Sequence, residues 1–211
     1  MSRRFLGDVL FLMQVGFALT FGISQFAQLL SSTEGASMSW FAAWEVFLLL
    51  NLWLAWHAHK AQPSRITGQT LISYLVWSVM IALDLSAISL RDTWTWNERD
   101  ALTAELVGLG VVVTLVAGGF RIGDPLVKGW LAVFFKTVPQ AVLAWNIWLM
   151  GGGGIALAAI IAGHATILSR IGQLVLSIKE AGWDRNRIGS LISEVPNELS
   201  WALVTAIWLF R

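Results

Sequence analysis

The feature that most constrains this chain is a series of apolar segments, each long enough to cross a lipid bilayer. A transmembrane helix needs roughly 20 consecutive apolar residues. Segments of about that length lie near residues 5–30, 38–58, 67–90, 101–119, 125–150, 153–177 and 189–210. Little of the chain is left for a soluble domain. The sequence therefore predicts an all-α integral membrane protein with seven transmembrane helices.

The composition agrees with a bilayer environment and excludes several classes of function. Hydrophobic residues make up 56% of the 211 positions and charged residues only 13%, whereas soluble domains carry about 25% charged residues. The formal net charge of +1 gives no electrostatic basis for binding nucleic acid. The chain has no cysteine, which excludes disulfides and thiolate metal sites. His57 and His59 lie together beside Lys60 and His164 is alone, and no catalytic or nucleotide-binding pattern occurs, so we expect no metal, no cofactor and no enzymatic activity.

The distribution of basic residues predicts an orientation in the membrane. The basic start of the chain is followed by an apolar stretch that runs on through Leu30 without a small-residue cleavage site, so we interpret it as a retained first helix. Nine Lys and Arg residues lie on the side of the N-terminus, namely Arg3, Arg4, Lys60, Arg65, Arg121, Lys128, Lys179, Arg185 and Arg187, against Arg91, Arg99 and Arg211 on the other. By the positive-inside rule this predicts a cytoplasmic N-terminus, in what we take to be a bacterial inner membrane.

Two stretches of the chain resemble each other. Residues 23–56 and 137–170 each contain a helix end with a glutamine, a short polar or glycine-rich connection and a second long apolar helix, at an offset of 114 residues. That offset is the length of three transmembrane spans and one linker span. It predicts a 3+1+3 parallel repeat, with a first three-helix unit in 1–90, a linker helix in 91–123 and a second unit in 124–211. Asp124 followed by Pro125 is a helix start signal for the second unit.

Two proline pairs stand in the second unit, Pro139-Gln140 in the fifth span and Pro196-Asn197 in the last span. They resemble the Pro-Gln signature and the Pro-Asn motif of the PQ-loop superfamily, which includes the SWEET sugar carriers. In the first unit the signature has decayed to Ser24-Gln25.

The resemblance implies a transporter that works by alternating access. It implies solute contacts from Asn197 and from Gln69 or its neighbour Gly68, and a stacking residue at Trp53 or Trp56. It assigns the hinge to Pro139, with Gln140 and Gln25 beside it, although both glutamines also suit plain interhelical hydrogen bonds. It also implies an extracytoplasmic N-terminus, the reverse of the orientation predicted from charge, so both orientations remain open.

Charged residues inside apolar spans are costly and therefore functional candidates. Asp84 lies deep in the third span, where it should be protonated, paired or exposed to water, unless that helix ends early and Asp84 reaches the interface. Arg170 in the sixth span is its natural partner, or else extends to the nearer interface. Glu194, Asn197 and Glu198 share one face of the last helix, which lines a cavity or forms a solvated approach. We interpret Asp84, Arg170, Glu194 and Glu198 as candidates for proton coupling.

Two functions follow from these patterns. The first is transport of a small polar solute such as a sugar or an amino acid, with possible proton coupling. The second is a non-transporting subunit, receptor or scaffold of a larger membrane complex, since a fold can persist without its original activity. The expected partners are the lipid bilayer, a small solute, and a second copy of the chain or a larger membrane complex. A water-accessible cavity near the midplane, lined by polar residues from both units, would favour the first function.

Overall fold

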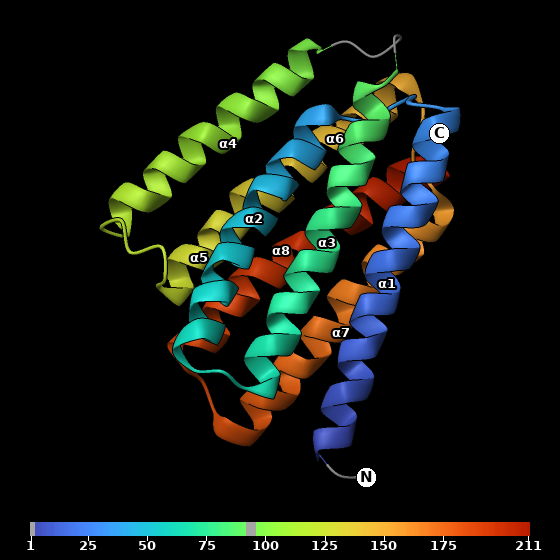
Figure 1. The fold of residues 1–211 in the computed structure, drawn as a ribbon. Coiled ribbons are helices and arrows are strands. Elements are labelled where there is room, and N and C mark those ends of the chain that lie inside the picture. The colour runs from blue at the N-terminus through green and yellow to red at the C-terminus, as the bar shows by residue number, and fades with distance from the viewer. Residues whose placement is uncertain (1–2, 92–95) are drawn as a thin grey trace.

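The computed structural model describes residues 3–91 and 96–211, which fold into helices joined by short loops (Figure 1). The helices are α1 (Arg3–Ser31), α2 (Met38–Ala61), α3 (Arg65–Ser89), α4 (Glu98–Ala117), α5 (Pro125–Ala132), the π-helical segment η1 (Val133–Thr137), α6 (Val138–Met150), α7 (Leu157–Ala181) and α8 (Arg185–Leu209). α5, η1 and α6 follow one another without a break. No strand occurs in the described ranges, so the prediction of an all-α fold is confirmed.

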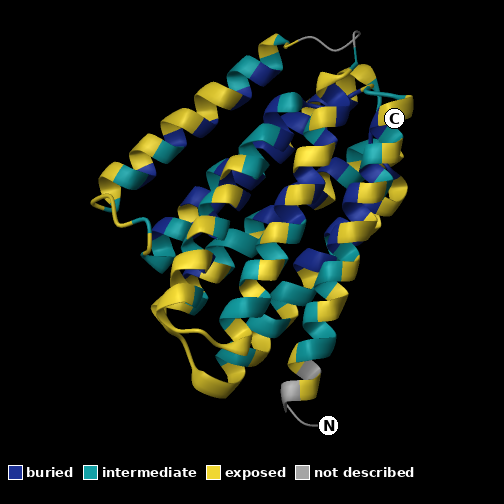
Figure 2. Cartoon of the chain, viewed as in Figure 1, coloured by how far each residue is buried: buried dark blue, intermediate teal, exposed yellow. Residues whose placement is uncertain are grey.

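Six helical spans within the described ranges are long and apolar enough to cross a membrane. They are Gly7–Ser31, Met38–Ala61, Arg65–Ser89, Glu98–Ala117, Pro125–Met150 and Leu157–Ala181. α8 is also 25 residues long but carries charged residues along its length, among them Glu194 and Glu198. Large apolar side chains remain exposed on the outer faces, for example Leu109 and Val116 on α4 (Figure 2). The chain is therefore a helical integral membrane protein.

Several helices begin at a side chain that caps the free backbone N–H groups. The Asp124 carboxylate accepts hydrogen bonds from the backbone of Leu126 and Val127, with Pro125 in the first turn, as the sequence predicted. Ser64 and Asn97 cap α3 and α4 in capping boxes. These caps fix where the spans leave the loops.

The helices before and after α4 pack in the same order. In the first half of the protein, α1–α3, helix α3 packs against both α1 and α2. In the second half, α5–α8, helix α8 packs against the α5–α6 span and against α7. Between the halves, α1 lies on α7, and α2 lies on η1 and α6 (Figure 1). The third helix of each half is thus the central one.

α4 lies at the periphery, against α2 and the α5–α6 span (Figure 1). Its buried Asp100 carboxylate accepts hydrogen bonds from the Ser39 backbone N–H at 3.1 Å and from the Ser37 hydroxyl at 2.9 Å, both at the start of α2. The neighbouring Arg99 donates to the amide oxygen of Asn146 on α6. The first turn of α4 is therefore attached to both halves.

α5 and α8 approach closely at two glycines. A Cβ atom on Gly189 would lie 2.1 Å from the Pro125 carbonyl oxygen, and one on Gly129 would lie 2.5 Å from the Gly189 carbonyl oxygen. Small residues at such crossings let helix backbones pack without intervening side chains, which is a main source of association between helices in a membrane.

Candidate functional site

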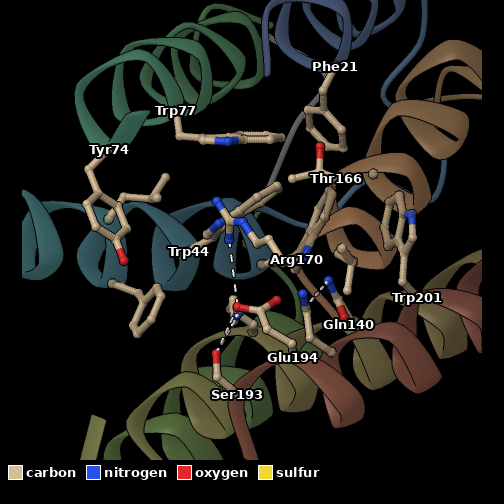
Figure 3. A pocket seen from close by; sticks show the side chains of 17 residues that line it. Phe21, Trp44, Tyr74, Trp77, Gln140, Thr166, Arg170, Ser193, Glu194 and Trp201 are labelled. Carbon is tan, nitrogen blue, oxygen red and sulfur yellow. Dashed lines mark hydrogen bonds and ion pairs between the residues drawn. The ribbon is translucent and has the colours of Figure 1, made fainter. Parts of the chain in front are cut away.

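A cavity of about 80 Å³ lies between the two halves, at the centre of the helices. Helices α1, α2 and α3 contribute to its wall from the first half, and η1, α6, α7 and α8 from the second (Figure 3). At the roughly 30 Å³ that a water molecule occupies in the liquid, it has room for about two or three water molecules. Both halves line the cavity, but its charged and amide side chains all come from the second half, whereas the first half contributes Tyr74 with other aromatic and aliphatic side chains.

One side of the cavity is a cluster of five aromatic rings. Phe21 on α1 lies 5.3 Å from Trp44 and 5.5 Å from Trp77, measured between ring centroids. Trp40 stacks on Trp201 of α8 at 5.7 Å. The indole N–H groups of Trp40 and Trp77 are buried and have no hydrogen-bond partner among the described residues. This aromatic cluster (Phe21, Trp40, Trp44, Trp77 and Trp201) therefore offers flat apolar surface to the cavity.

Another side of the cavity is charged. The Lys136 ammonium group, on η1, lies 3.5 Å from Oε1 of Glu194 and 3.2 Å from the Ser193 hydroxyl. The Arg170 guanidinium group, on α7, lies 3.7 Å from the same Glu194 oxygen (Figure 3). The other Glu194 oxygen is buried without a hydrogen-bond partner among the residues described. Two cations thus share one oxygen of a single carboxylate.

A neutral polar network completes the wall. The Gln140 amide donates to the Asn197 side-chain oxygen at 3.1 Å and accepts a hydrogen bond from the Ser200 hydroxyl. Gln140 and Asn197 are both buried and both line the cavity. The two sequence motifs, Pro139-Gln140 and Pro196-Asn197, therefore meet at the cavity wall.

The proline of the first motif follows a widened helical turn. Pro139 has no N–H group to donate within the helix. The π-helical segment Val133–Thr137 directly precedes it, and the Val138 N–H bonds to the Val133 carbonyl, one residue farther back than in an α-helix. Such segments are frequent at functional sites. Here the widened turn includes Lys136, whose ammonium group reaches Glu194.

Two larger cavities connect the charged side of the central cavity to the end of the molecule that holds the N-terminus. One, of about 670 Å³, lies between α1, α3, α7 and α8, and the other, of about 240 Å³, lies between α2, α3, α5 and α8. Tyr74 and Glu194 line both of them and the central cavity as well. We call this the open end.

The opposite end, which holds the loops 32–37 and 151–156, is tied together across the halves. The buried Gln25 side chain donates to the Gly154 carbonyl at 2.6 Å and accepts from the Ala156 N–H at 3.1 Å. Gln28 donates to the Gly153 carbonyl at 2.5 Å, and the Gly154 N–H donates to the Glu34 carbonyl at 2.8 Å. We call this the closed end. Gln25, predicted beside the hinge, thus bridges the two halves there.

At the open end the ion pairs stay within one half. Asp8 of α1 pairs with Arg65 of α3. Asp124 pairs with Arg185 at 2.8 Å, and the hydrogen bonds from that guanidinium group hold the pKa of the Asp124 carboxyl below its usual range. A contact between the halves on this side is the bond from Gln14 to Gln173, which is long at 3.4 Å. The open end is therefore joined across the halves by weaker contacts than the closed end.

Two of the residues that the resemblance assigns to solute contact lie away from the cavity. Trp53 and Trp56 are 54% and 56% exposed on the outside of α2, so they face the surroundings and not the cavity. Trp40 and Trp44, one turn apart on the other face of the same helix, line the cavity instead. Gln69 lines the larger cavity of the open end and donates to Asp8 at 2.8 Å. It lies on the approach to the central cavity and not in its wall.

The charged candidates are distributed differently from the prediction. Asp84 is fully buried, and neither of its carboxylate oxygens has a hydrogen-bond partner among the described residues. The expected pairing of Asp84 with Arg170 is wrong, because Arg170 lies against Glu194. Glu198 lies 2.7 Å from His164 of α7, outside the central cavity. A role for Asp84 in proton coupling would require a conformation in which water reaches it.

Sequence reasoning missed Lys136 and the cavity-lining tryptophans. The signal for Lys136 was its position inside an apolar span, where an ammonium group needs a buried partner. Glu194, an acid in another span, was the available partner. The tryptophans gave no such signal, because many tryptophans of a membrane protein lie at the interface.

Comparisons with known proteins leave the family of the chain open. No protein-family model, curated protein or solved structure matches it.

Proposed function

We propose that the protein is a membrane transporter that moves a small polar solute by alternating access, and that the structure represents the state open toward the N-terminal side. The central cavity carries this proposal. Both halves line it, it joins the cavities of the open end at Tyr74 and Glu194, and hydrogen bonds between the halves bridge the closed end. A scaffold would need neither a polar cavity between its halves nor buried charges lining it.

The packing order of the helices supports a 3+1+3 architecture for this transporter. In both halves the third helix lies between the first two, and the contacts between the halves are reciprocal, with the first span of each on the second span of the other. A parallel repeat about an axis along the membrane normal gives this pattern. We propose seven spans, with α8 crossing the membrane between helices that cover its charged face. The PQ-loop resemblance fits the same arrangement.

Rocking of the halves would exchange the open and closed ends. The bonds from Gln25 and Gln28 to the 151–156 loop would break, and the halves would approach around the two outer cavities. Pro139 and the π-helical segment before it would provide the hinge, because a widened turn has fewer regular hydrogen bonds to lose. The bias of basic residues supports a cytoplasmic open end, in what we take to be a bacterial inner membrane.

Cysteine labelling tests alternating access without knowledge of the solute. The natural chain has no cysteine, so a single one can be introduced at either end. Ser190→Cys lies exposed at the open end, and Ala36→Cys lies buried at the closed end. In nanodiscs we expect a water-soluble maleimide to modify Ser190→Cys quickly and Ala36→Cys slowly but measurably.

The decisive result is a reciprocal response. A change that raises the reactivity at position 36 should lower it at position 190, because the two states share one population. A buried Ala36→Cys that reacts only when the protein unfolds would refute alternating access and favour the scaffold.

A further inference from the structure

The two cations of the central cavity have unused hydrogen-bonding capacity. A charge-assisted hydrogen bond is usually about 2.7–2.9 Å long, whereas Lys136 and Arg170 lie 3.5 and 3.7 Å from their shared oxygen on Glu194. A guanidinium group has five N–H donors, and an ammonium group has three. One carboxylate oxygen cannot satisfy them, so donors of both side chains remain for a bound group.

The charges along the approach favour an anion. Glu194 is the only acid that lines the central cavity or the two cavities of the open end, within the part of the chain that the structure describes. The bases there are Lys136, Arg170 and Lys128, of which Lys128 has no ion-pair partner among the described residues. Cavities lined by one sign of charge concentrate ions of the opposite sign. In the central cavity two cations face one carboxylate, which leaves an excess of one positive charge.

The aromatic cluster defines the rest of the solute. A body in contact with Trp44 and Trp77 must be apolar or flat. Asn197 lines the cavity and accepts from Gln140 through its side-chain oxygen, while its NH2 group has no acceptor among the described residues, which favours a further solute oxygen that can accept. The cavity of about 80 Å³ restricts the solute to a small molecule.

We propose that the solute is a short organic monocarboxylate that carries a further oxygen acceptor outside its carboxylate, such as a small oxo or hydroxy acid. This inference rests on the proposed transport function. The solute carboxylate lies between Arg170 and Lys136, where it competes with Glu194, and its body lies against the aromatic cluster. Release then restores the contacts of both cations to Glu194, so Glu194 acts as an internal substitute for the solute.

Pyruvate, with six non-hydrogen atoms, is the probe. Its binding to the purified protein in nanodiscs is measured by tryptophan fluorescence, since four tryptophans line the cavity. Propionate lacks the keto oxygen of pyruvate, and hydroxyacetone lacks the negative charge. We expect saturable quenching by pyruvate, weaker binding of propionate and none of hydroxyacetone. Equal binding of propionate would overturn the need for an oxygen outside the carboxylate, and equal binding of hydroxyacetone would overturn the need for a negative charge. No binding of pyruvate would overturn the assignment of the solute to the short monocarboxylates.

Two substitutions of similar shape should act in opposite directions. Arg170→Gln removes a charged donor and should weaken pyruvate binding roughly 13- to 160-fold, the range for a hydrogen bond to a charged group. Glu194→Gln removes the competing carboxylate and should strengthen binding several-fold. A residue with a merely structural role would not give this opposition. If Arg170→Gln does not fold, Glu194→Gln still decides, because weaker binding in that variant contradicts the competition.

The cysteine experiment separates this proposal from the proposed function. Reciprocal labelling of Ser190→Cys and Ala36→Cys without pyruvate binding would keep the transporter and overturn the solute class. Pyruvate binding without reciprocal labelling would keep the solute class and leave a binding protein instead of a transporter. As a further check, Lys128→Gln should slow pyruvate association and reduce its dependence on salt, because Lys128 lies on the approach and not beside the bound carboxylate. An unchanged association rate would contradict the electrostatic approach.

Discussion

Gln25 stabilises the closed end through two hydrogen bonds, and removing them should open it. The change is Gln25→Met, which keeps the length of the side chain but neither donates nor accepts strongly. Each buried hydrogen bond contributes about 0.5–1.5 kcal/mol net. Loss of the bonds to the Gly154 carbonyl and the Ala156 N–H therefore favours the alternative state by about 1–3 kcal/mol, which is roughly a 5- to 160-fold change in the equilibrium constant.

The assay is the labelling rate of Ala36→Cys in the Gln25→Met background, with Ser190→Cys measured in parallel. We expect the first rate to rise within that range while the second falls. Gln14→Met is the matched control, because Gln14 also joins α1 to α7 but lies toward the open end with a long bond. Its loss should leave the rate at position 36 unchanged or lower it. A folded Gln25→Met protein with unchanged rates at both positions would show that Gln25 does not hold the closed end.

Three further predictions test the packing, the cavity wall and the orientation. Gly189→Ala should lower the free energy of unfolding by about 1–3 kcal/mol, because its Cβ would meet the backbone of α5. Gly172→Ala should be tolerated, because no atom lies within 4 Å of its added Cβ. Thermal unfolding in detergent measures both variants, and equal stabilities would contradict the close crossing of α5 and α8. Trp44→Ala should weaken pyruvate binding by about 0.5–1.5 kcal/mol in the fluorescence titration. Trp53→Ala should leave binding unchanged, since of these two tryptophans only Trp44 lines the cavity. A larger effect from Trp53→Ala would refute the assignment of Trp44 to the solute site. A reporter fused to the C-terminus should give an extracytoplasmic signal, and a cytoplasmic signal would favour the orientation that the resemblance implies.

The helices were predictable because their signals are local. Apolar length gave the spans, and the Asp124-Pro125 pair marked the start of α5 where the structure has it. The faces of the helices were not predictable in the same way. A helix in lipid is apolar on its outer side as well as its inner side, so periodicity does not identify the buried face. Trp40 and Trp53 both lie on α2, but only Trp40 is on the face turned toward the cavity.

The candidate site was predicted in part. Asn197 and Glu194 line the cavity, because a polar face on the last helix has few other places to lie. The partner of Arg170 could not be chosen, since Asp84 and Glu194 both offered a carboxylate in an apolar span. The choice depends on which helices are neighbours, and α7 packs on α8. Which helices are neighbours is a property of the tertiary structure, and the pattern of residues along the chain does not give it.

Under the proposed alternating access, the attachment of α4 bears on how the two halves would stay coordinated. α4 is the stretch of chain that connects them, and its first turn holds the start of α2 through Asp100 and the end of α6 through Arg99. If the closed end parts, one of these attachments must yield. Asp100 is fully buried with several bonds to α2, so the start of α4 should travel with the first half while its far end follows α5. α4 would then change its tilt in the bilayer during each transport cycle. Because α4 faces the lipid, the free energy of that change would depend on the thickness of the membrane.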